Sequence, residues 1–390
     1  MKYKTQLIII LFIIILAAVP IVSMASPDRL LSEVERRPLS QLTGYSQYLD
    51  THYGAGLSDY LAYLENYLLD QFPLRDELRS LNAVGRVYGL RQRDYKLYYK
   101  LEGHLAKLDP VLRPNAVERA LALFNRLNSD LFDGQGKQLF ALIPDKNVFM
   151  AEKEGYPHYP YVGMLDLIEK NLGGDIHLLS LLDHLSLDHY YRTDPHWDQT
   201  SLKPVSSHIL EALGHPDYGS ESYHVSEGLA DYFGIYAGQA ALPVEADRLS
   251  WLSSQRLDNL TLYDPVTGER TGIYQQDKLE GIDPYDFFMG GAKPLLIIGN
   301  EAREEGRQLV IFRDSFGSSL IPLLADAYRE VIVIDLRYIS MGAVSDLADI
   351  DPGADVLHLY SMSVLNSPGA FLNSINDTLS RTVEKESKKT

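Results

Sequence analysis

The sequence predicts an α/β domain with three layers (αβα), in which a mostly parallel sheet is covered by helices on both faces. After Pro114, short apolar runs alternate with amphipathic helical stretches. This alternation is typical of parallel sheets buried on both sides. The chain has 390 residues and no cysteine, so we expect its stability to rest on a large apolar core without disulfides.

Residues 1–26 are predicted to be a signal anchor or a signal peptide. Lys2 and Lys4 precede an apolar run from Leu7 to Val22. This run is longer than most signal-peptide cores, about 7 to 15 residues, and shorter than a spanning helix of about 20. Small residues at 23–25 fit cleavage, whereas the length and the isoleucine content favour a retained membrane anchor. In both cases we expect the rest of the chain to be extracytoplasmic.

The net charge of −17 argues against two kinds of partner. Nucleic-acid binding depends on clustered Lys and Arg. A peripheral hold on anionic lipid needs the same positive charge. We therefore expect no nucleic-acid partner, and contact with the membrane only through the N-terminal segment.

Residues 27–95 are predicted to form a helical spacer between that segment and the main domain. From Leu57 to Leu90, apolar residues recur every three or four positions, as on one face of a helix. Pro73 interrupts this pattern because it disfavours helical backbone at Phe72. The pattern therefore predicts two helices joined near residues 70–75.

Residues 96–383 are predicted to form the main domain, with a disordered tail at 384–390. Within the domain, 214–289 fits the strand and helix alternation poorly and is predicted to be loops or a β-rich insertion. One predicted helix, after Pro114, runs through Val117, Leu121, Phe124, Leu127 and Leu131, and two others span 202–213 and 317–328. The predicted strands are 139–143, 176–179, 295–298, 309–312, 331–334 and 356–360.

Ser315 is the first candidate for chemistry. It follows the buried run Leu309–Phe312 and precedes a helical stretch that begins at Gly317. Such a serine lies at the carboxyl edge of the sheet, where α/β proteins bind ligands. Free amides at the helix start could stabilise a negatively charged oxygen there. The alternative interpretation is that the serine only caps the helix.

A nucleophilic serine needs a histidine base that a carboxylate orients. Asp194 and His196 meet this need, because residues two apart in an extended loop project to the same side. Pro195 stiffens the link between them. Trp197 is predicted either to exclude water from the site or to belong to the core.

The segment Asp194–Trp197 resembles the Asp-x-His-Trp signature of the DHHW proteins and the alginate O-acetylation proteins AlgJ and AlgX. In this group an SGNH-hydrolase-like domain carries the Asp–His pair ahead of the serine, as it does here. Pro195 stands where DHHW proteins have a second histidine, and only Asp194 and His196 are carried over. The resemblance spans roughly residues 60 to 365. It includes further segments at Gln71–Arg75, Ile143–Asn147, Tyr285–Phe288 and Asp335–Tyr338.

The resemblance implies a serine-dependent O-acyltransferase, with Ser315, His196 and Asp194 as its catalytic residues. Acetylation of an exported cell-surface polysaccharide is the implied reaction. A membrane-bound O-acyltransferase is the implied partner, and an acyl donor is needed but no cofactor. The same three residues would also serve a carbohydrate esterase or deacetylase. A third hypothesis is a non-catalytic assembly protein that binds polysaccharide.

Five further residues are candidates for binding substrate. Gly290, Gly291 and Asn300 are candidates for the oxyanion site, although none of them matches an ordinary SGNH glycine or asparagine block. Arg337 and Tyr338 follow a predicted strand and could position a sugar or an acyl oxygen. Their alternative roles are a salt bridge and a packed ring.

A metal-dependent hydrolase is the rival to serine chemistry. Imidazole and carboxylate are ordinary zinc ligands. However, neither a His-x-x-x-His spacing nor a cysteine pair is present, and we predict no metal site. The potential ligands in this stretch are Asp183, His184, Asp188, His189, Asp194 and His196.

Overall fold

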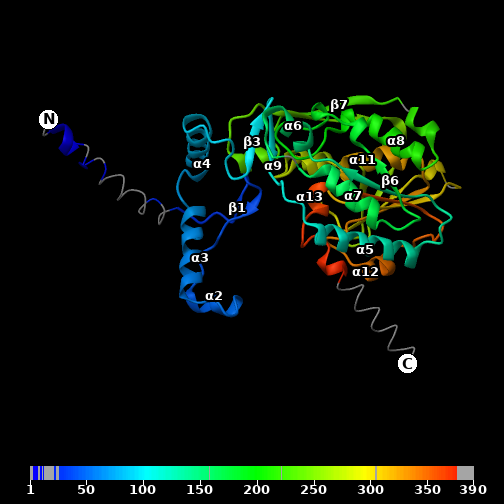
Figure 1. The fold of residues 1–390 in the computed structure, drawn as a ribbon, viewed down its shortest axis with the longest axis horizontal. Helices are drawn as coiled ribbons and strands as arrows, with labels where there is room; N and C mark the ends of the chain where they lie inside the picture. Colours follow the sequence, from blue (N-terminus) through cyan, green and yellow to red (C-terminus); the bar gives the residue numbers. More distant parts are fainter. Residues whose placement is uncertain are drawn as a thin grey trace. The chain divides into compact units, whose positions relative to one another are not determined.

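The computed structural model describes residues 3–7, 9, 10, 12, 22, 26–157, 159–220, 222–303 and 305–375. Most of the apolar run of the predicted signal segment and the predicted tail at 384–390 lie outside these residues. Within the described part of the chain, no helix is long and apolar enough to cross a membrane. The chain divides into two units, 1–96 with 237–243 and 97–236 with 244–390 (Figure 1).

The first unit is mainly helical. A short strand pair, β1 (Leu31–Ser32) and β2 (Arg37–Pro38), precedes helix α2 (Tyr45–Thr51). The two predicted helices are confirmed as α3 (Leu57–Asp70) and α4 (Arg75–Val84). The residue before Pro73 is not helical, as predicted. A short π-helical turn (Gly85–Gly89) follows α4.

Buried ion pairs hold the first unit together. Asp70 accepts two hydrogen bonds from the Arg37 guanidinium, at 2.6 and 3.0 Å, and one from the Ser40 amide at 3.0 Å. Burial raises the pKa of Asp70, but these donors outweigh it and lower that pKa to about 2. Arg75 and Glu35, both buried, pair at 2.5 Å. Residues 35–40 are therefore bound to both sides of the break, at the last residue of α3 and the first residue of α4.

The second unit is built on an eight-stranded sheet of order β10-β9-β11-β13-β12-β14-β5-β6. The five strands from β13 to β6 are parallel, and β11, β9 and β10 extend one edge in antiparallel pairing. The predicted mostly parallel α/β fold is thus confirmed. The strands are β5 (Gln138–Ile143), β6 (His177–Ser180), β9 (Thr261–Asp264), β10 (Glu269–Gly272), β11 (Leu295–Gly299), β12 (Gln308–Arg313), β13 (Glu330–Ile334) and β14 (Asp355–Ser361).

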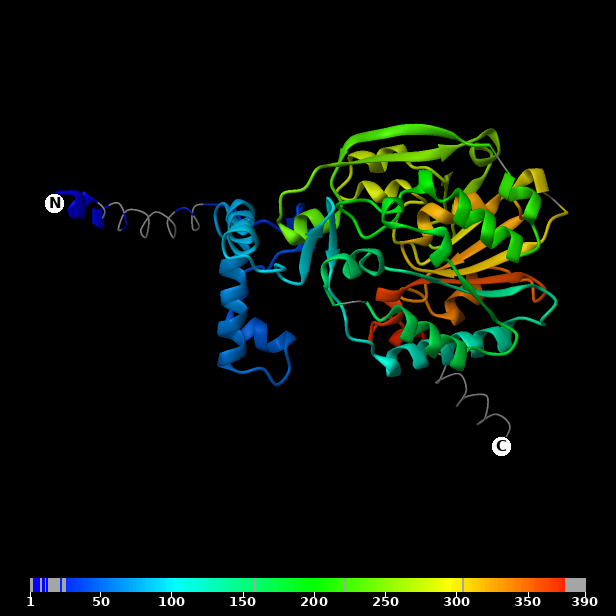
Figure 2. The same ribbon diagram turned by 45° about the horizontal axis from the view of Figure 1, so that its top comes forward.

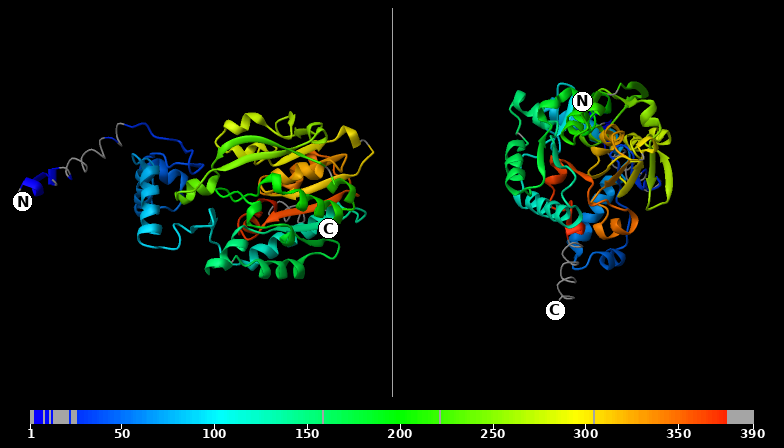
Figure 3. Two further views of the ribbon diagram at one scale, coloured as in Figure 1. Left: turned by 90° about the horizontal axis from the view of Figure 1, so that it is seen from above. Right: turned by 90° about the vertical axis from the view of Figure 1, so that its right-hand side faces the viewer.

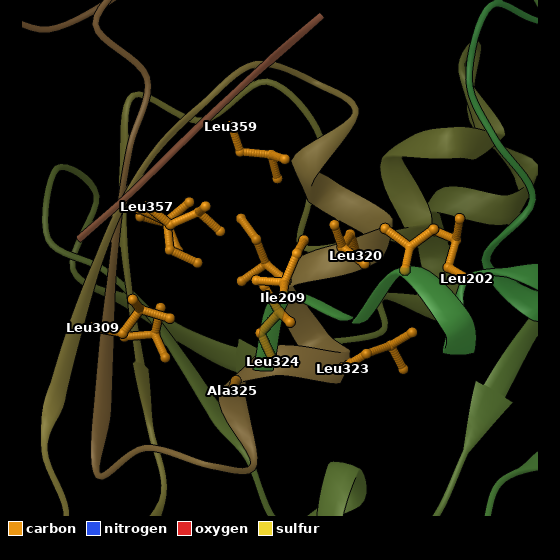
Figure 4. Packing of buried hydrophobic residues seen from close by; sticks show 14 of the residues in the cluster. Leu202, Ile209, Leu309, Leu320, Leu323, Leu324, Ala325, Leu357 and Leu359 are labelled. Carbon is orange, nitrogen blue, oxygen red and sulfur yellow. The ribbon is translucent and has the colours of Figure 1, made fainter. Parts of the chain in front are cut away.

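Helices cover both faces of this sheet (Figures 2 and 3). Alternate residues of β12 enter different cores: Leu309 and Ile311 pack on one face, and Val310 and Phe312 on the other. The first core contains α8 (Lys203–Ala212) and α11 (Gly317–Ala325), and Figure 4 shows Ile209 of α8 and Leu320 of α11 in the same cluster as Leu357 and Leu359 of β14. The second contains α5 (Pro114–Leu131), α7 (Tyr161–Asn171), α12 (Met341–Leu347) and α13 (Met362–Leu365).

The region 214–289, predicted to be loops or a β-rich insertion, contains a hairpin of β7 (His224–Tyr232) and β8 (Asp247–Ser253). Its strands β9 and β10 belong to the main sheet. Helix α9 (Ile235–Ala240) follows β7, and the short helix α10 (Gln255–Asp258) follows β8. Elsewhere, β3 (Tyr98–Leu101) and β4 (His104–Lys107) pair at the start of the unit, and α6 (Asn147–Glu154) follows β5.

Candidate active site

Ser315 lies in the tight turn between β12 and α11, at the carboxyl edge of the sheet. Asp314 holds this turn. Its Oδ1 accepts a hydrogen bond from the Phe316 amide at 3.0 Å, and its Oδ2 accepts from the amide and hydroxyl of Ser361, on the neighbouring β14, at 2.7 and 2.6 Å. The serine is therefore presented on the edge where parallel sheets bind ligands.

The Ser315 hydroxyl faces His196, with Oγ and Nε2 2.8 Å apart. The first amides of α11 donate to Asp314 and to the Ser315 carbonyl, and none of them donates to the Ser315 hydroxyl. The alternative interpretation of Ser315 as a helix cap is therefore wrong. The structure instead brings this serine into hydrogen-bond contact with the histidine that the sequence singled out, 119 residues earlier in the chain.

Asp194 orients the imidazole from the other side. Its Oδ1 contacts His196 Nδ1 at 2.6 Å and also accepts from the His196 amide at 3.1 Å, while Oδ2 accepts from the Ile235 amide at 3.0 Å. Burial raises the pKa of this carboxyl, but the imidazole and the two amide donors outweigh it and lower the pKa well below its usual range. Asp194 therefore stays ionised, as a partner that stabilises an imidazolium must.

Aromatic rings enclose the imidazole. Tyr285 stacks on His196 with ring centroids 4.0 Å apart and an interplanar angle of 9°, and Phe316 lies at 4.7 Å. The Tyr285 hydroxyl bonds to Ser319 Oγ at 2.8 Å, which fixes the ring. Trp197 is fully buried, and its Nε1 donates to the Phe316 carbonyl and to Ser319 Oγ, each at 3.0 Å. Trp197 thus belongs to the core that supports the turn.

The amides at the start of α11 are less available than the sequence predicted. The Phe316 and Gly317 amides both donate to Asp314, and the Ser318 amide donates to the Ser315 carbonyl at 3.1 Å. The Ser315 amide has no acceptor among the described residues. It is therefore available to an incoming oxygen beside the Ser315 hydroxyl.

The three oxyanion candidates do not lie at the same edge of the sheet. Gly290 and Gly291 precede β11 at the carboxyl edge, and the Gly291 carbonyl accepts from the buried guanidinium of Arg313 at 3.3 Å. Asn300 follows β11, which runs antiparallel to β13 with Gly299 opposite Glu330, the first residue of that strand. Asn300 is therefore at the opposite edge, where it donates to the Asp326 carbonyl. Its candidacy for the oxyanion site was wrong because the sequence did not reveal the direction of β11.

Arg337 and Tyr338 follow β13 at the carboxyl edge. The Arg337 guanidinium makes a two-point ion pair with the buried Asp335, at 2.8 and 2.6 Å, and lies 5.1 Å from the centre of the Tyr338 ring. Arg337 therefore has the salt bridge that was considered as its alternative role. Tyr338 is 57% exposed, so it is not a packed core ring.

The side chains of the metal hypothesis do not gather at one point. No group of three or more potential metal ligands occurs among the described residues. His184 stacks on His208 with centroids 4.1 Å apart, and His189 Nδ1 bonds to Ser186 Oγ at 2.8 Å. Asp194 and His196 bond to each other, as described above.

Sequence reasoning missed Tyr285 and Ile235 as members of the site. Tyr285 was noted only as part of a segment resembling the DHHW proteins, and Ile235 follows β7 in the region predicted to be an insertion. It also missed Lys146 and Asp247, two buried charges that hold the loop of Asp194. The one available signal was a lysine three positions after the end of a strand, in the segment Ile143–Asn147.

Comparisons with known proteins give matches at the level of structure. No family model and no curated protein matches the sequence. A DHHW family protein from Eubacterium siraeum matches with a TM-score of 0.56 at 19% identity, over 72% of this chain and 94% of its own. Bacillus cereus PatB1, in a structure with a sulfonyl adduct, matches with a TM-score of 0.55 at 20% identity, over 70% of this chain and 98% of its own. The chain has the fold of these two proteins.

The resemblance that was inferred from the Asp-x-His-Trp segment is thereby confirmed for the fold. The O-acetyltransferase domain of Pseudomonas putida AlgJ also matches, over 73% of this chain, with a TM-score of 0.40 at 13% identity.

Proposed function

We propose that this chain is a serine-dependent O-acyltransferase that acetylates a hydroxyl group of an exported cell-surface polysaccharide. The observation that carries the proposal is the hydrogen-bonded series Ser315 Oγ, His196 Nε2, His196 Nδ1 and Asp194 Oδ1, with contacts of 2.8 and 2.6 Å. This series supplies a nucleophile, a base and an orienting carboxylate in one place. The sequence resemblance supports acetyl as the group and a polysaccharide as the acceptor.

The reaction proceeds in two transfers. Ser315 Oγ attacks the acyl carbonyl while its proton passes to His196 Nε2, and the imidazolium then protonates the departing oxygen of the donor. This leaves an acyl ester on Ser315. A sugar hydroxyl next gives its proton to His196 and attacks that ester, and the imidazolium then protonates the departing Ser315 Oγ, which returns both residues to their starting state. Asp194 stays ionised throughout and stabilises the imidazolium.

The developing oxyanion needs donors close to Ser315. The Ser315 amide is the candidate in the turn itself, and the Gly290 amide is a candidate on the neighbouring loop at the same sheet edge. The Gly291 amide already donates to the Phe288 carbonyl, at 3.3 Å. Tyr338, exposed at this edge, offers an aromatic face for a sugar ring. The stacked Tyr285 reduces the access of water to the imidazole.

The cellular setting belongs to the same proposal. The N-terminal apolar segment tethers the exported chain to the membrane, and a membrane-bound O-acyltransferase supplies acyl groups to it. Fractionation of cells tests the tether, because the mature chain should stay with the membrane. Recovery of the chain in the medium, with an N-terminus at Ser26, would identify a cleaved signal peptide instead.

The catalytic test uses the purified full-length chain, an activated acetyl ester and oligosaccharide acceptors. We expect acetylated sugar by mass spectrometry, and a loss of at least about 10³-fold for Ser315→Ala or His196→Ala. Because the residues act as one unit, the double variant should be scarcely worse than either single variant. Release of acetate at equal rates with and without sugar would identify an esterase. Unchanged polymer acetylation by a folded Ser315→Ala variant would favour the binding-protein hypothesis.

A sulfonyl fluoride provides an independent probe of the nucleophile. The solved structure of Bacillus cereus PatB1 carries a sulfonyl adduct, and this chain shares its fold. We expect the reagent to add one sulfonyl group to the peptide that contains Ser315, with loss of fluoride. The labelling should be slow in His196→Ala. Labelling of any other residue at a comparable rate would contradict the assignment of Ser315.

A further inference from the structure

Lys146 is a fully buried cation that contacts the loop carrying Asp194. It lies between β5 and α6, and none of its surface is exposed. Its Nζ donates to the carbonyl oxygens of Tyr191 at 2.8 Å, Arg192 at 3.3 Å and Asp194 at 2.7 Å. Burial of an ammonium group is costly unless its donors are satisfied. Here all three N–H donors of the Lys146 ammonium have an acceptor, and the three acceptors belong to one short loop.

A buried anion holds the amide groups of the same loop. Asp247 accepts from the Arg192 amide at 2.7 Å and from the amide of Thr193 at 2.8 Å, and the Thr193 hydroxyl also donates to it. Next to this loop, the Tyr190 hydroxyl donates to the Pro144 carbonyl at 2.7 Å. The loop is thus fixed through its carbonyls by a cation and through its amides by an anion, which leaves the Asp194 backbone little freedom.

We infer that Lys146 is a positioning residue for the proposed acyl transfer, which acts by holding Asp194, and through it His196, in line with Ser315. The inference rests on the proposed function. Lys146 does not touch the reacting atoms; its contacts are with the loop backbone. A displacement of about 1 Å at a reacting group can lower a rate about 10²-fold. Loss of the three hydrogen bonds from Lys146 to this loop would allow Asp194 and His196 to move by such a distance.

The charge of Lys146 gives the inference a readout that a packing role lacks. Burial lowers the pKa of its ammonium to about 8, although the carboxylates of Asp194, Asp145 and Asp247 act to raise it. The imidazole of His104 and the Tyr236 ring, 5.2 Å from Nζ, also face it. Above that pKa, a neutral amine has two donors for three carbonyls. We therefore expect kcat to fall about tenfold between pH 7.5 and 10.

Stability changes in the opposite direction over this pH range. Because the folded-state pKa of Lys146 is below the ordinary 10.5, the unfolded chain binds more protons between about pH 8 and 10.5. The contribution of this group to the free energy of unfolding therefore rises with pH in that window. A fall in kcat with an intact circular dichroism spectrum would reflect lost positioning and not unfolding.

The experiment measures kcat and KM for an activated acetyl ester from pH 6 to 10, with the purified full-length chain. Lys146→Met should lower kcat about 100-fold with KM little changed, whereas Lys146→Arg should keep more activity and move the alkaline fall to higher pH. Lys107→Met is the matched control, because Lys107 also lies over a tyrosine ring, at 5.9 Å, but is exposed. It should behave as wild type.

Two results would overturn the inference while leaving the proposed function intact. One is wild-type kcat in a folded Lys146→Met variant. The other is a flat wild-type kcat from pH 7.5 to 10, which decides the matter even if neither Lys146 variant folds. Failure of the proposed function looks different, because Ser315→Ala would then cleave the ester as fast as wild type at every pH.

Discussion

Replacing Asp194 by Asn separates the charge of this residue from its hydrogen bonds. Two donors contact Oδ1, namely His196 Nδ1 and the His196 amide, and the Ile235 amide contacts Oδ2. An asparagine has one acceptor oxygen and one NH₂ group. With its oxygen in the Oδ1 position, its NH₂ group faces the Ile235 amide, and that one donor loses its acceptor. In the reverse orientation, the NH₂ group faces the two His196 donors, and both lose their acceptor. We therefore expect the oxygen to remain at Oδ1, which preserves the histidine tautomer.

The predicted loss of activity then comes from the missing charge. Two unit charges about 4 Å apart, at an effective dielectric constant of about 20, interact by about 4 kcal/mol. Each 1.36 kcal/mol changes a rate tenfold, so Asp194→Asn should lower kcat by about 10³-fold. In serine proteases the corresponding change costs about 10⁴-fold because the wrong tautomer forms. The smaller loss expected here follows from the two donors at Oδ1.

The assay is ester cleavage by the purified variant, with circular dichroism to confirm the fold. Asp198→Asn serves as a matched control, since this carboxylate is on the same loop but accepts hydrogen bonds from the Thr200 amide and hydroxyl. It should keep kcat within about threefold of wild type. An Asp194→Asn variant within tenfold of wild type would refute the role assigned to the carboxylate.

Much of the candidate site could be predicted because its chemistry is local in sequence. A buried apolar run followed by a polar turn and a glycine specifies the β12–α11 connection, and it places Ser315 at the carboxyl edge of the sheet. The two-residue spacing of Asp194 and His196 places both side chains on one loop. These inferences need only the period of a strand and the order of elements, and both can be read directly from the chain.

The rest depends on tertiary contacts that no local pattern encodes. Tyr285 stacks on an imidazole 89 positions earlier, and this follows from how the region after β8 packs on the sheet edge. Asn300 was a candidate for the oxyanion site, but β11 runs antiparallel to β13 and Asn300 therefore lies at the opposite edge; a short apolar run such as β11 does not reveal the direction of its strand. Strands β9 and β10 were not predicted individually because they are short and carry polar residues, and their stability comes from pairing: β9 pairs with β11, and β10 pairs with β9.

Three further predictions concern stability and can all be measured by urea unfolding. Trp197→Phe should cost about 1–3 kcal/mol, because it removes two hydrogen bonds from a fully buried ring. Asp70 has a folded-state pKa of about 2, below the ordinary 3.8, so its contribution of roughly 2 kcal/mol is present above pH 4 and is lost as the pH falls toward 2. An Asp70→Asn variant should be less sensitive to pH in this window. The last prediction compares Gly291→Ala with Gly134→Ala. Both glycines have left-handed backbone, with φ of 81° and 79°, so each substitution incurs the same backbone strain of about 1–2 kcal/mol. A methyl group at Gly291 would collide with the Asp286 carboxylate, whereas at Gly134 no atom lies within 4 Å. Gly291→Ala should therefore be less stable than Gly134→Ala by about a further 1–3 kcal/mol. Equal losses in the two variants would mean that the carboxylate moves aside freely, and that the loop before β11 is not held in the geometry on which the oxyanion candidates depend.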